Sequence, residues 1–155
     1  IKNHAYPTHY KITTLPIEIP LMYSIIRQES VFDQHAVSSA KAMGLMQVQK
    51  PTACDTAKKI SMTYHPQKLT KDRSYIMAIA AYNGGPHNVK KWIKIYGDPR
   101  EMKDHRSVLD WIEIMPFYET RNYVQRVLEN LQIYRTILNK NDELHLKKDL
   151  MRKTK

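Results

Sequence analysis

Apolar side chains recur every three or four positions along most of this chain, which is the spacing of amphipathic helices. One such helix is expected over residues 21–30, directly after a proline that suits a first helical turn. Its apolar stripe consists of Met22, Ile25 and Ile26. The next position on the stripe is Glu29, so this helix is expected to end its inward face in a carboxylate.

Further helices follow from the same periodicity and from the glycines and prolines that end them. They are expected over residues 51–60, 73–82, 87–96, 106–115 and 117–139. The helix over residues 73–82 is apolar on all sides, so it is expected to lie at the centre of the fold. Residues 33–50 are expected to form a loop with short turns.

The two ends of the chain differ from this helical body. Residues 1–20 contain three prolines and are expected to form an extended lead-in from an upstream domain, because proline breaks helices. Residues 140–155 are charged and are expected to fray. The sequence therefore predicts a mainly α protein with a single helical domain over residues 21–139. The first residue is Ile rather than Met, which suggests a processed or trimmed piece.

The composition fits this prediction. The chain of 155 residues is 42% hydrophobic and 26% charged, and it contains only 4 glycines. These values are ordinary for a folded domain and argue against wholesale disorder. The sequence has neither a run of 18 apolar residues nor a visible signal peptide, so no membrane-spanning helix is expected.

The formal net charge is +10 and the isoelectric point is about 9.6. A basic surface suits an anionic partner such as an envelope polymer, a membrane surface or nucleic acid. A host with a lysine-rich proteome explains the charge equally well. The sequence contains no helix-turn-helix or RNA-binding signature, so a specific nucleic-acid partner is not expected.

Cysteine and histidine usage argues against a metal site. Cys54 is the sole cysteine, so neither an internal disulfide nor a cysteine-rich zinc cluster can form, and it is expected to be a packed small residue. The seven histidines are scattered and form no metal-binding pair. The sequence therefore predicts neither a metal nor another cofactor.

Glu29 is the strongest candidate for chemistry. Burial disfavours the charged form of a carboxyl and raises its pKa, and a carboxyl that stays protonated can act as a general acid and then a general base. The alternative is a buried Glu that pairs with an Arg or caps a helix. Ser30 could orient Glu29 or a substrate group, or it could simply end the helix.

Two pairs of polar residues are further candidates. Tyr82 and Asn83 lie at the end of the buried helix, where they could line a cleft or form a tight turn. Glu119 and Tyr123 are four residues apart and share a helix face. Glu119 could instead favour the positive N-terminus of that helix.

Together these pieces resemble the ordered motifs of the Slt-type lytic murein transglycosylases, and the resemblance covers roughly residues 5–139. The matching segments, in chain order, are Glu29-Ser30, Ala42-Met43-Gly44-Leu45-Met46-Gln47, Ala81-Tyr82-Asn83-Gly84-Gly85-Pro86, and the run from Ile114 to Val124. Four motifs in the right order are far more specific than any one of them.

This resemblance implies a lysozyme-like, mostly helical fold and cleavage of the β-1,4 bond between N-acetylmuramic acid and N-acetylglucosamine in peptidoglycan. It implies that Glu29 is the single catalytic acid/base. The residues that it implies for substrate contact are Ser30, Met46, Gln47, Tyr82, Asn83, Glu119 and Tyr123. It also implies a monomer in the periplasm or cell envelope of a bacterium, with peptidoglycan strands as its partner.

The resemblance also explains why one carboxylate suffices. Most glycosidases use two, whereas a lytic transglycosylase needs one and leaves a 1,6-anhydromuramyl end without using water. The sequence marks out no second carboxylate near Glu29, although Asp33 stays open as a candidate.

The chain departs from the family pattern at several positions. Lys41 replaces a glycine, and Gly84 replaces an alanine in what is expected to be a mild change. About one helix ahead of Ala81 is expected to be missing, which would remove apolar core and could displace Tyr82 from Glu29. Two alternatives therefore stay open: a lysozyme-like hydrolase, and a degenerate relative that binds glycan without cleaving it.

Overall fold

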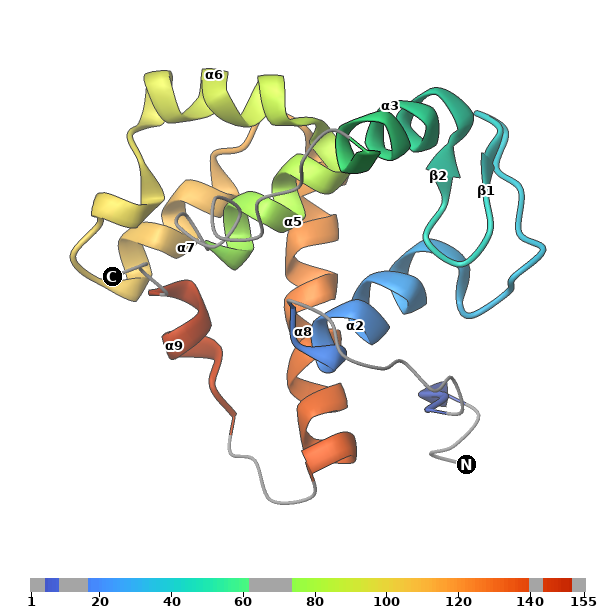
Figure 1. Cartoon of the computed structure of the whole chain (residues 1–155). Helices are drawn as coiled ribbons and strands as arrows, with labels where there is room; N and C mark the ends of the chain where they lie inside the picture. Colours follow the sequence, from blue (N-terminus) through green and yellow to red (C-terminus); the bar gives the residue numbers. More distant parts are fainter. Residues whose placement is uncertain (1–4, 9–16, 62–73, 140–143, 152–155) are drawn as a thin grey trace.

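The computed structural model describes residues 5–8, 17–61, 74–139 and 144–151. Among these residues a long helix, α8 (Tyr118–Asn139), runs through the middle of the molecule, and shorter helices pack around it (Figure 1). Its principal helical neighbours are α2 and α5. The predicted mainly α fold is confirmed.

Helix α2 (Ile19–Ser30) carries the predicted apolar stripe, and Ile25 and Ile26 are buried. Pro20 lies in the first turn, where its missing N–H costs no hydrogen bond. The helix therefore starts two residues inside the predicted lead-in. It ends at Val31, whose φ of 51° lies in the left-handed region that a β-branched residue rarely adopts.

A small aromatic cluster fastens α2 to the C-terminal half of α8. Tyr23 of α2 and Phe32 just after it both pack against Tyr134 of α8. Tyr6 from the lead-in adds an edge-on contact to Tyr134, with ring centroids 5.4 Å apart. This packing fixes the direction in which α2 presents its last turn.

A short antiparallel hairpin follows α2. Strands β1 (Ala42–Met43) and β2 (Val48–Gln49) pair so that Ala42 lies opposite Gln49. The prediction of a loop with short turns is wrong for these strand residues. Helix α3 (Lys50–Ser61) then confirms the predicted short helix, but Cys54 on it is exposed, so its prediction as a packed residue is wrong.

Helix α5 (Tyr75–Gly84) begins at Ser74, whose hydroxyl accepts a hydrogen bond from the backbone N–H of Met77. The helices that follow are α6 (Pro86–Tyr96), the 3-10 turn η1 (Pro99–Glu101) and α7 (His105–Glu113). All three predicted helices in this part of the chain are confirmed to within a few residues. Residues 62–73, where the sequence lacks the expected helical segment, lie outside the described residues.

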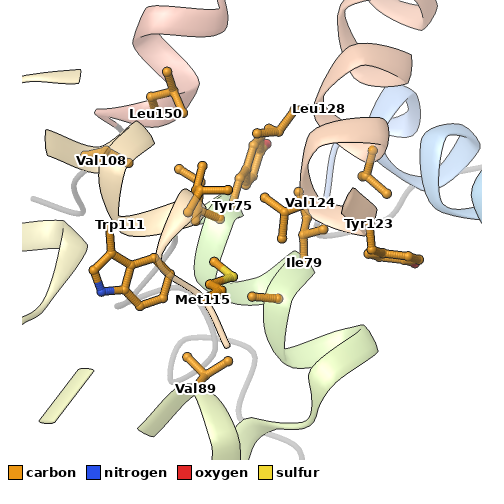
Figure 2. Packing of buried hydrophobic residues seen from close by; sticks show 14 of the residues in the cluster. Tyr75, Ile79, Val89, Val108, Trp111, Met115, Tyr123, Val124, Leu128 and Leu150 are labelled. Carbon is orange, nitrogen blue, oxygen red and sulfur yellow. The ribbon is translucent and has the colours of Figure 1, made fainter. Parts of the chain in front are cut away.

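The main core lies where α5, α6, α7 and α8 meet (Figure 2). Ile79 of α5 and Val124 of α8 are almost wholly buried, which confirms the central position predicted for α5. Trp111 of α7 is 1% exposed, and its indole N–H donates a 2.9 Å hydrogen bond to the Gly97 carbonyl. Each fully buried large side chain contributes about 1.5–3 kcal/mol.

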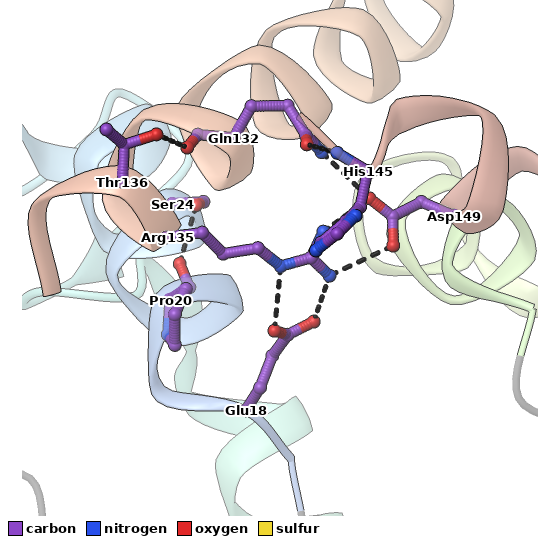
Figure 3. A network of polar contacts seen from close by, with 8 residues as sticks. All are labelled: Glu18, Pro20, Ser24, Gln132, Arg135, Thr136, His145 and Asp149. Atoms are coloured by element: carbon purple, nitrogen blue, oxygen red, sulfur yellow. Dashed lines mark hydrogen bonds and ion pairs between the residues drawn. The ribbon is translucent and has the colours of Figure 1, made fainter. Parts of the chain in front are cut away.

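The C-terminal segment forms a helix, α9 (Leu146–Leu150), and does not fray as predicted over those residues. Arg135 of α8 is buried and donates hydrogen bonds to Glu18, before α2, and to Asp149 of α9 (Figure 3). The shortest N–O distance to each carboxylate is 2.6 Å. One guanidinium therefore joins the start of α2 to the end of the described chain.

Candidate active site

Glu29 lies in the last turn of α2, half-buried, and its side chain meets α8. The hydroxyl of Tyr123 donates a 2.6 Å hydrogen bond to Oε1 of Glu29. The two residues come from elements 94 positions apart in sequence, and the docking of α2 on α8 brings them together.

Glu29, Asn83 and Glu119 each line two cavities, of about 750 Å³ and 350 Å³. The other residues around the larger one are Ser38, Ala42, Gln47, Val48, Gln49, Thr52, Ala81, Tyr82, Gly85 and Pro86. Those around the smaller one are Gln28, Tyr118, Asn122, Tyr123 and Arg126. Because the three shared residues border both cavities, the cavities adjoin at Glu29, and together they are called the cleft below.

The environment raises the pKa of Glu29. Burial is the largest cause, because it removes water from the charged form. The hydrogen bond from Tyr123 lowers the pKa in part, and the nearby carboxylate of Glu119 raises it again. The net result is a carboxyl that holds its proton at higher pH than an exposed glutamate does, as a general acid requires.

Two tyrosines form the wall beside Glu29. The ring of Tyr82 is stacked on that of Tyr123, with centroids 6.4 Å apart and an interplanar angle of 8°. The Tyr82 hydroxyl donates a 2.6 Å hydrogen bond to the Met46 carbonyl, which ties α5 to the hairpin loop. Burial and the charge of Glu29 raise the pKa of Tyr82 to about 12, and burial raises the pKa of Tyr123 well above its usual value. Both phenols therefore remain protonated donors.

Asn83 is held by α8. The hydroxyl of Thr120 donates a 2.7 Å hydrogen bond to Oδ1 of Asn83, and Thr120 is only 1% exposed. Fixing Oδ1 in this way leaves the amide N–H groups of Asn83 as the donors available to the cleft.

The structure brings most of the predicted site residues together. Those that line the cleft are Glu29, Gln47, Tyr82, Asn83, Glu119 and Tyr123. Ser30 and Met46 are not among the lining residues. The Ser30 hydroxyl donates to the Leu45 carbonyl at 2.9 Å, and the Met46 side chain packs against the core while its carbonyl serves Tyr82. Both therefore shape the loop that borders the cleft.

Other lining residues were missed by the sequence analysis. Tyr118, Asn122 and Arg126 recur every four positions along α8, so they form a stripe beside Glu119 and Tyr123. That spacing was visible in the sequence and could have indicated them. No such signal in the sequence indicated Thr120, because its hydrogen bond to Asn83 depends on how α5 packs against α8.

Asp33, the other carboxylate left open by the sequence, has a local role. Its side chain accepts a 2.8 Å hydrogen bond from the backbone N–H of His35, and it is exposed. The second carboxylate beside Glu29 is Glu119, which borders both cavities.

In the part of the chain that the structure describes, no cluster of His, Cys, Asp or Glu could hold a metal ion. None of the helices there is both long and apolar enough to cross a bilayer.

Comparison with protein families places these features in context. The model of the transglycosylase SLT domain matches residues 9–74, and that of the soluble lytic transglycosylase helical domain matches residues 115–143. The chain is 30% identical to a soluble lytic murein transglycosylase of Haemophilus influenzae over 96% of its own length. It is 32% identical to the soluble lytic murein transglycosylase of Escherichia coli K12 over 84% of its length. The chain belongs to the soluble lytic transglycosylase family.

Solved structures of the family share the fold. The 70 kDa soluble lytic transglycosylase of Escherichia coli superimposes with a TM-score of 0.70 at 26% identity, over 90% of this chain and 25% of that protein. An inactive mutant of the lytic transglycosylase Slt from Pseudomonas aeruginosa gives a TM-score of 0.64 at 29% identity, over 84% of this chain and 24% of that protein. The predicted lysozyme-like helical fold is confirmed by this match.

The chain spans only 28% and 23% of the length of the curated Haemophilus and Escherichia relatives. The alignment with the Haemophilus protein extends over 172 positions, more than the 155 residues of this chain, so it contains gaps here. That agrees with the expected shortening relative to lytic transglycosylases. The shortening does not separate Tyr82 from Glu29, because both line the larger cavity.

Proposed function

We propose that this chain is a lytic transglycosylase domain that cleaves the β-1,4 bond between N-acetylmuramic acid and N-acetylglucosamine in peptidoglycan, with Glu29 as its single acid/base. The observation that carries the proposal is the position of Glu29. It lies where the two cavities meet, its pKa is raised, and Tyr123 donates a hydrogen bond to its carboxyl.

In the first step, protonated Glu29 gives its proton to the glycosidic oxygen as the bond from that oxygen to muramyl C1 breaks. The 2-acetamido group of the muramyl residue stabilises the positive charge at C1. In the second step, the C6 hydroxyl of the same sugar attacks C1 and returns its proton to Glu29. The products are a 1,6-anhydromuramyl end and a free hydroxyl on the departing sugar, and no water is consumed.

The neighbours of Glu29 suit both steps. Burial favours the protonated acid before the first step, and the phenol of Tyr123 stabilises the carboxylate that the first step leaves. Thr120 orients the Asn83 amide, whose N–H groups would donate to a carbonyl oxygen of the glycan.

The relatives support the same assignment. Those compared above are described as soluble lytic murein transglycosylases, and the inactive Pseudomonas protein differs from its parent by a glutamate-to-glutamine replacement. We further propose that the chain acts as a monomer in the periplasm or cell envelope of a bacterium, where its substrate lies.

One observation favours a second candidate, a lysozyme-like hydrolase. Glu119 borders both cavities together with Glu29, so the cleft contains a pair of carboxylates. In a two-carboxylate glycosidase the second group is a nucleophile or activates water, and the product has a reducing end.

The experiment is to digest purified peptidoglycan sacculi and identify the released muropeptides by mass spectrometry, with Glu29→Gln and Glu119→Gln beside the wild type. Anhydro ends from the wild type and none from Glu29→Gln support the proposal. Reducing ends that disappear in Glu119→Gln assign the hydrolase instead. A folded wild type that releases nothing indicates a relative that binds glycan without cleaving it.

A further inference from the structure

Helix α6 has two contrasting faces. Its inner face packs into the core through Val89 and Trp92, which are buried. Its outer face carries four exposed basic residues at positions i, i+3, i+4 and i+7 of the helix, namely His87, Lys90, Lys91 and Lys94. We call these residues the basic stripe.

No carboxylate of the described residues forms an ion pair with a lysine of the basic stripe. Helix α6 contains no acidic residue, and the ion pairs found among the described residues include none of its lysines. Like charges spaced three and four residues apart repel one another on a helix. On α8, by contrast, the exposed Arg126 pairs with Glu129 at 3.0 Å. A helix selected only for its own stability would place acidic residues between these lysines.

The basic stripe starts at the edge of the cleft. Gly85 and Pro86, which begin α6, line the larger cavity, and α6 then runs along the top of the molecule, away from the β1–β2 hairpin (Figure 1). With a rise of 1.5 Å per residue, the stripe extends about 10 Å from its first to its last member. A ligand that occupies the larger cavity therefore lies next to a row of lysines that form no ion pair among the described residues.

We propose that the basic stripe of α6 binds the carboxylates of the peptide stems attached to a peptidoglycan strand in the cleft. This inference rests on the proposed function. The stems are short peptides with free carboxylates, carried on the same sugars that the cleft would hold. Lysines suit such a ligand, because a flexible ammonium group can follow carboxylates whose positions vary.

A membrane surface fits α6 less well. An interfacial helix inserts an apolar face between lipids. The apolar face of α6 is already buried in the core, and Ile95 is its one large apolar residue with high exposure. The stripe can therefore attract anions but cannot insert.

The test measures binding in a Glu29→Gln background, so that the substrate is not consumed. The stripe variant combines Lys90→Gln, Lys91→Gln and Lys94→Gln. Its matched control combines Lys103→Gln, Lys147→Gln and Lys148→Gln, which removes the same charge from exposed positions that do not line the cleft. Binding is measured by co-sedimentation with intact sacculi and with sacculi whose stems an amidase has removed.

The stripe variant is expected to bind intact sacculi about tenfold more weakly at low salt. Each exposed ion pair contributes only a small binding free energy, but the three contributions add together. The control is expected to stay close to the parent. The difference should vanish on stem-free glycan, and also at about 0.5 M salt, where screening is strong.

An equal loss of binding in the two variants would overturn the proposal, because it would show a general effect of net charge. A loss of binding that persists on stem-free glycan would also overturn it. So would a stripe variant that binds sacculi like its parent, or one whose binding weakens only on anionic phosphatidylglycerol vesicles. Failure of the proposed function is distinguishable, because it appears as missing anhydro products from the wild type, whereas this test reads binding alone.

Discussion

The hydroxyl of Tyr123 lies 2.6 Å from Oε1 of Glu29 and donates its proton to it. This contact joins the last turn of α2 to the first half of α8. Glu29 borders both cavities of the cleft, and Tyr123 borders the smaller one. A donor favours the ionised form of the carboxyl that it contacts, so Tyr123 opposes the burial that raises the pKa of Glu29. The balance between the two sets the pH range in which Glu29 can act as an acid.

Tyr123→Phe should shift the pH dependence of kcat/KM. In the proposed reaction the active form has protonated Glu29, so the rate falls as pH rises through the pKa of Glu29. Removing the hydroxyl raises that pKa, and the descending limb should move to higher pH. The maximum of kcat/KM should fall roughly tenfold, because a hydrogen bond to a charged group contributes about 1.5–3 kcal/mol. Tyr96→Phe, outside the cleft, should leave the profile unchanged, and a limb that moves to lower pH would contradict the assignment.

Glu29→Gln should make the protein more stable at neutral pH while abolishing activity. The folded pKa of Glu29 is raised, so folding favours the protonated form, and its contribution to stability is lost as pH rises through that pKa. Glutamine stays neutral, so the variant avoids the cost of burying a charge and should gain about 0.5–2 kcal/mol at pH 7, the range of a typical single stabilising substitution. The gain should shrink toward acidic pH in urea titrations. A gain that grows on acidification would mean that the sign of the pKa shift is wrong.

Much of the fold could be predicted because its helices are amphipathic and end at glycine or proline. The helix predicted over residues 87–96 is Pro86–Tyr96, and the one predicted over 117–139 is Tyr118–Asn139. Helix α9 was missed because its apolar spacing rests on two residues alone, Leu146 and Leu150, in a charged segment of five residues. It is held by Arg135 on another helix, and a pairing of that kind leaves no local pattern.

The candidate site, like the fold, could be predicted from the sequence only in part. Glu29 could be predicted because it continues an apolar stripe of its own helix. The hydrogen bonds around it could not, because they depend on how helices dock. Ser30 illustrates this: its neighbour in sequence is the catalytic candidate, but its hydroxyl points to the Leu45 carbonyl.

Thr120→Val should impair the reaction through Asn83. Valine fills nearly the same volume but cannot donate to Oδ1 of Asn83, so the amide loses its fixed orientation. We expect kcat/KM to fall about tenfold, with the loss mainly in KM if Asn83 binds the glycan equally in the ground and transition states. Thr120→Ser keeps the hydroxyl and loses a buried methyl group, which costs about 1 kcal/mol of stability. Equal activity in the two variants would show that Thr120 serves packing alone.

Arg135→Leu should destabilise the protein strongly. The substitution leaves Glu18 and the buried Asp149 without their shared guanidinium, and removal of one partner of a buried ion pair costs about 3–5 kcal/mol. Arg126→Leu on the same helix is the matched control. Its pair with Glu129 has side chains that are 67% and 60% exposed, so its loss should cost under about 1 kcal/mol. Similar midpoints for the two variants in urea unfolding would contradict the structural role of the network in Figure 3.

Gly84→Ala should be harmful here, although alanine is the usual residue of the family motif and the change was expected to be mild. A Cβ at this position would lie 2.9 Å from Oγ1 of Thr120 and 3.1 Å from the Trp92 ring. Overpacking of this kind costs about 1–3 kcal/mol, and only part of that is offset by the better helix propensity of alanine. Moving α5 away from α8 would also lengthen the bond from Thr120 to Asn83, so kcat/KM should fall together with stability. Thr120→Ala in the Gly84→Ala background removes the clashing Thr120 atoms but leaves the contact with Trp92, so it should restore part of the stability and none of the activity. A Gly84→Ala variant as stable and active as the wild type would show that the two helices have room to separate.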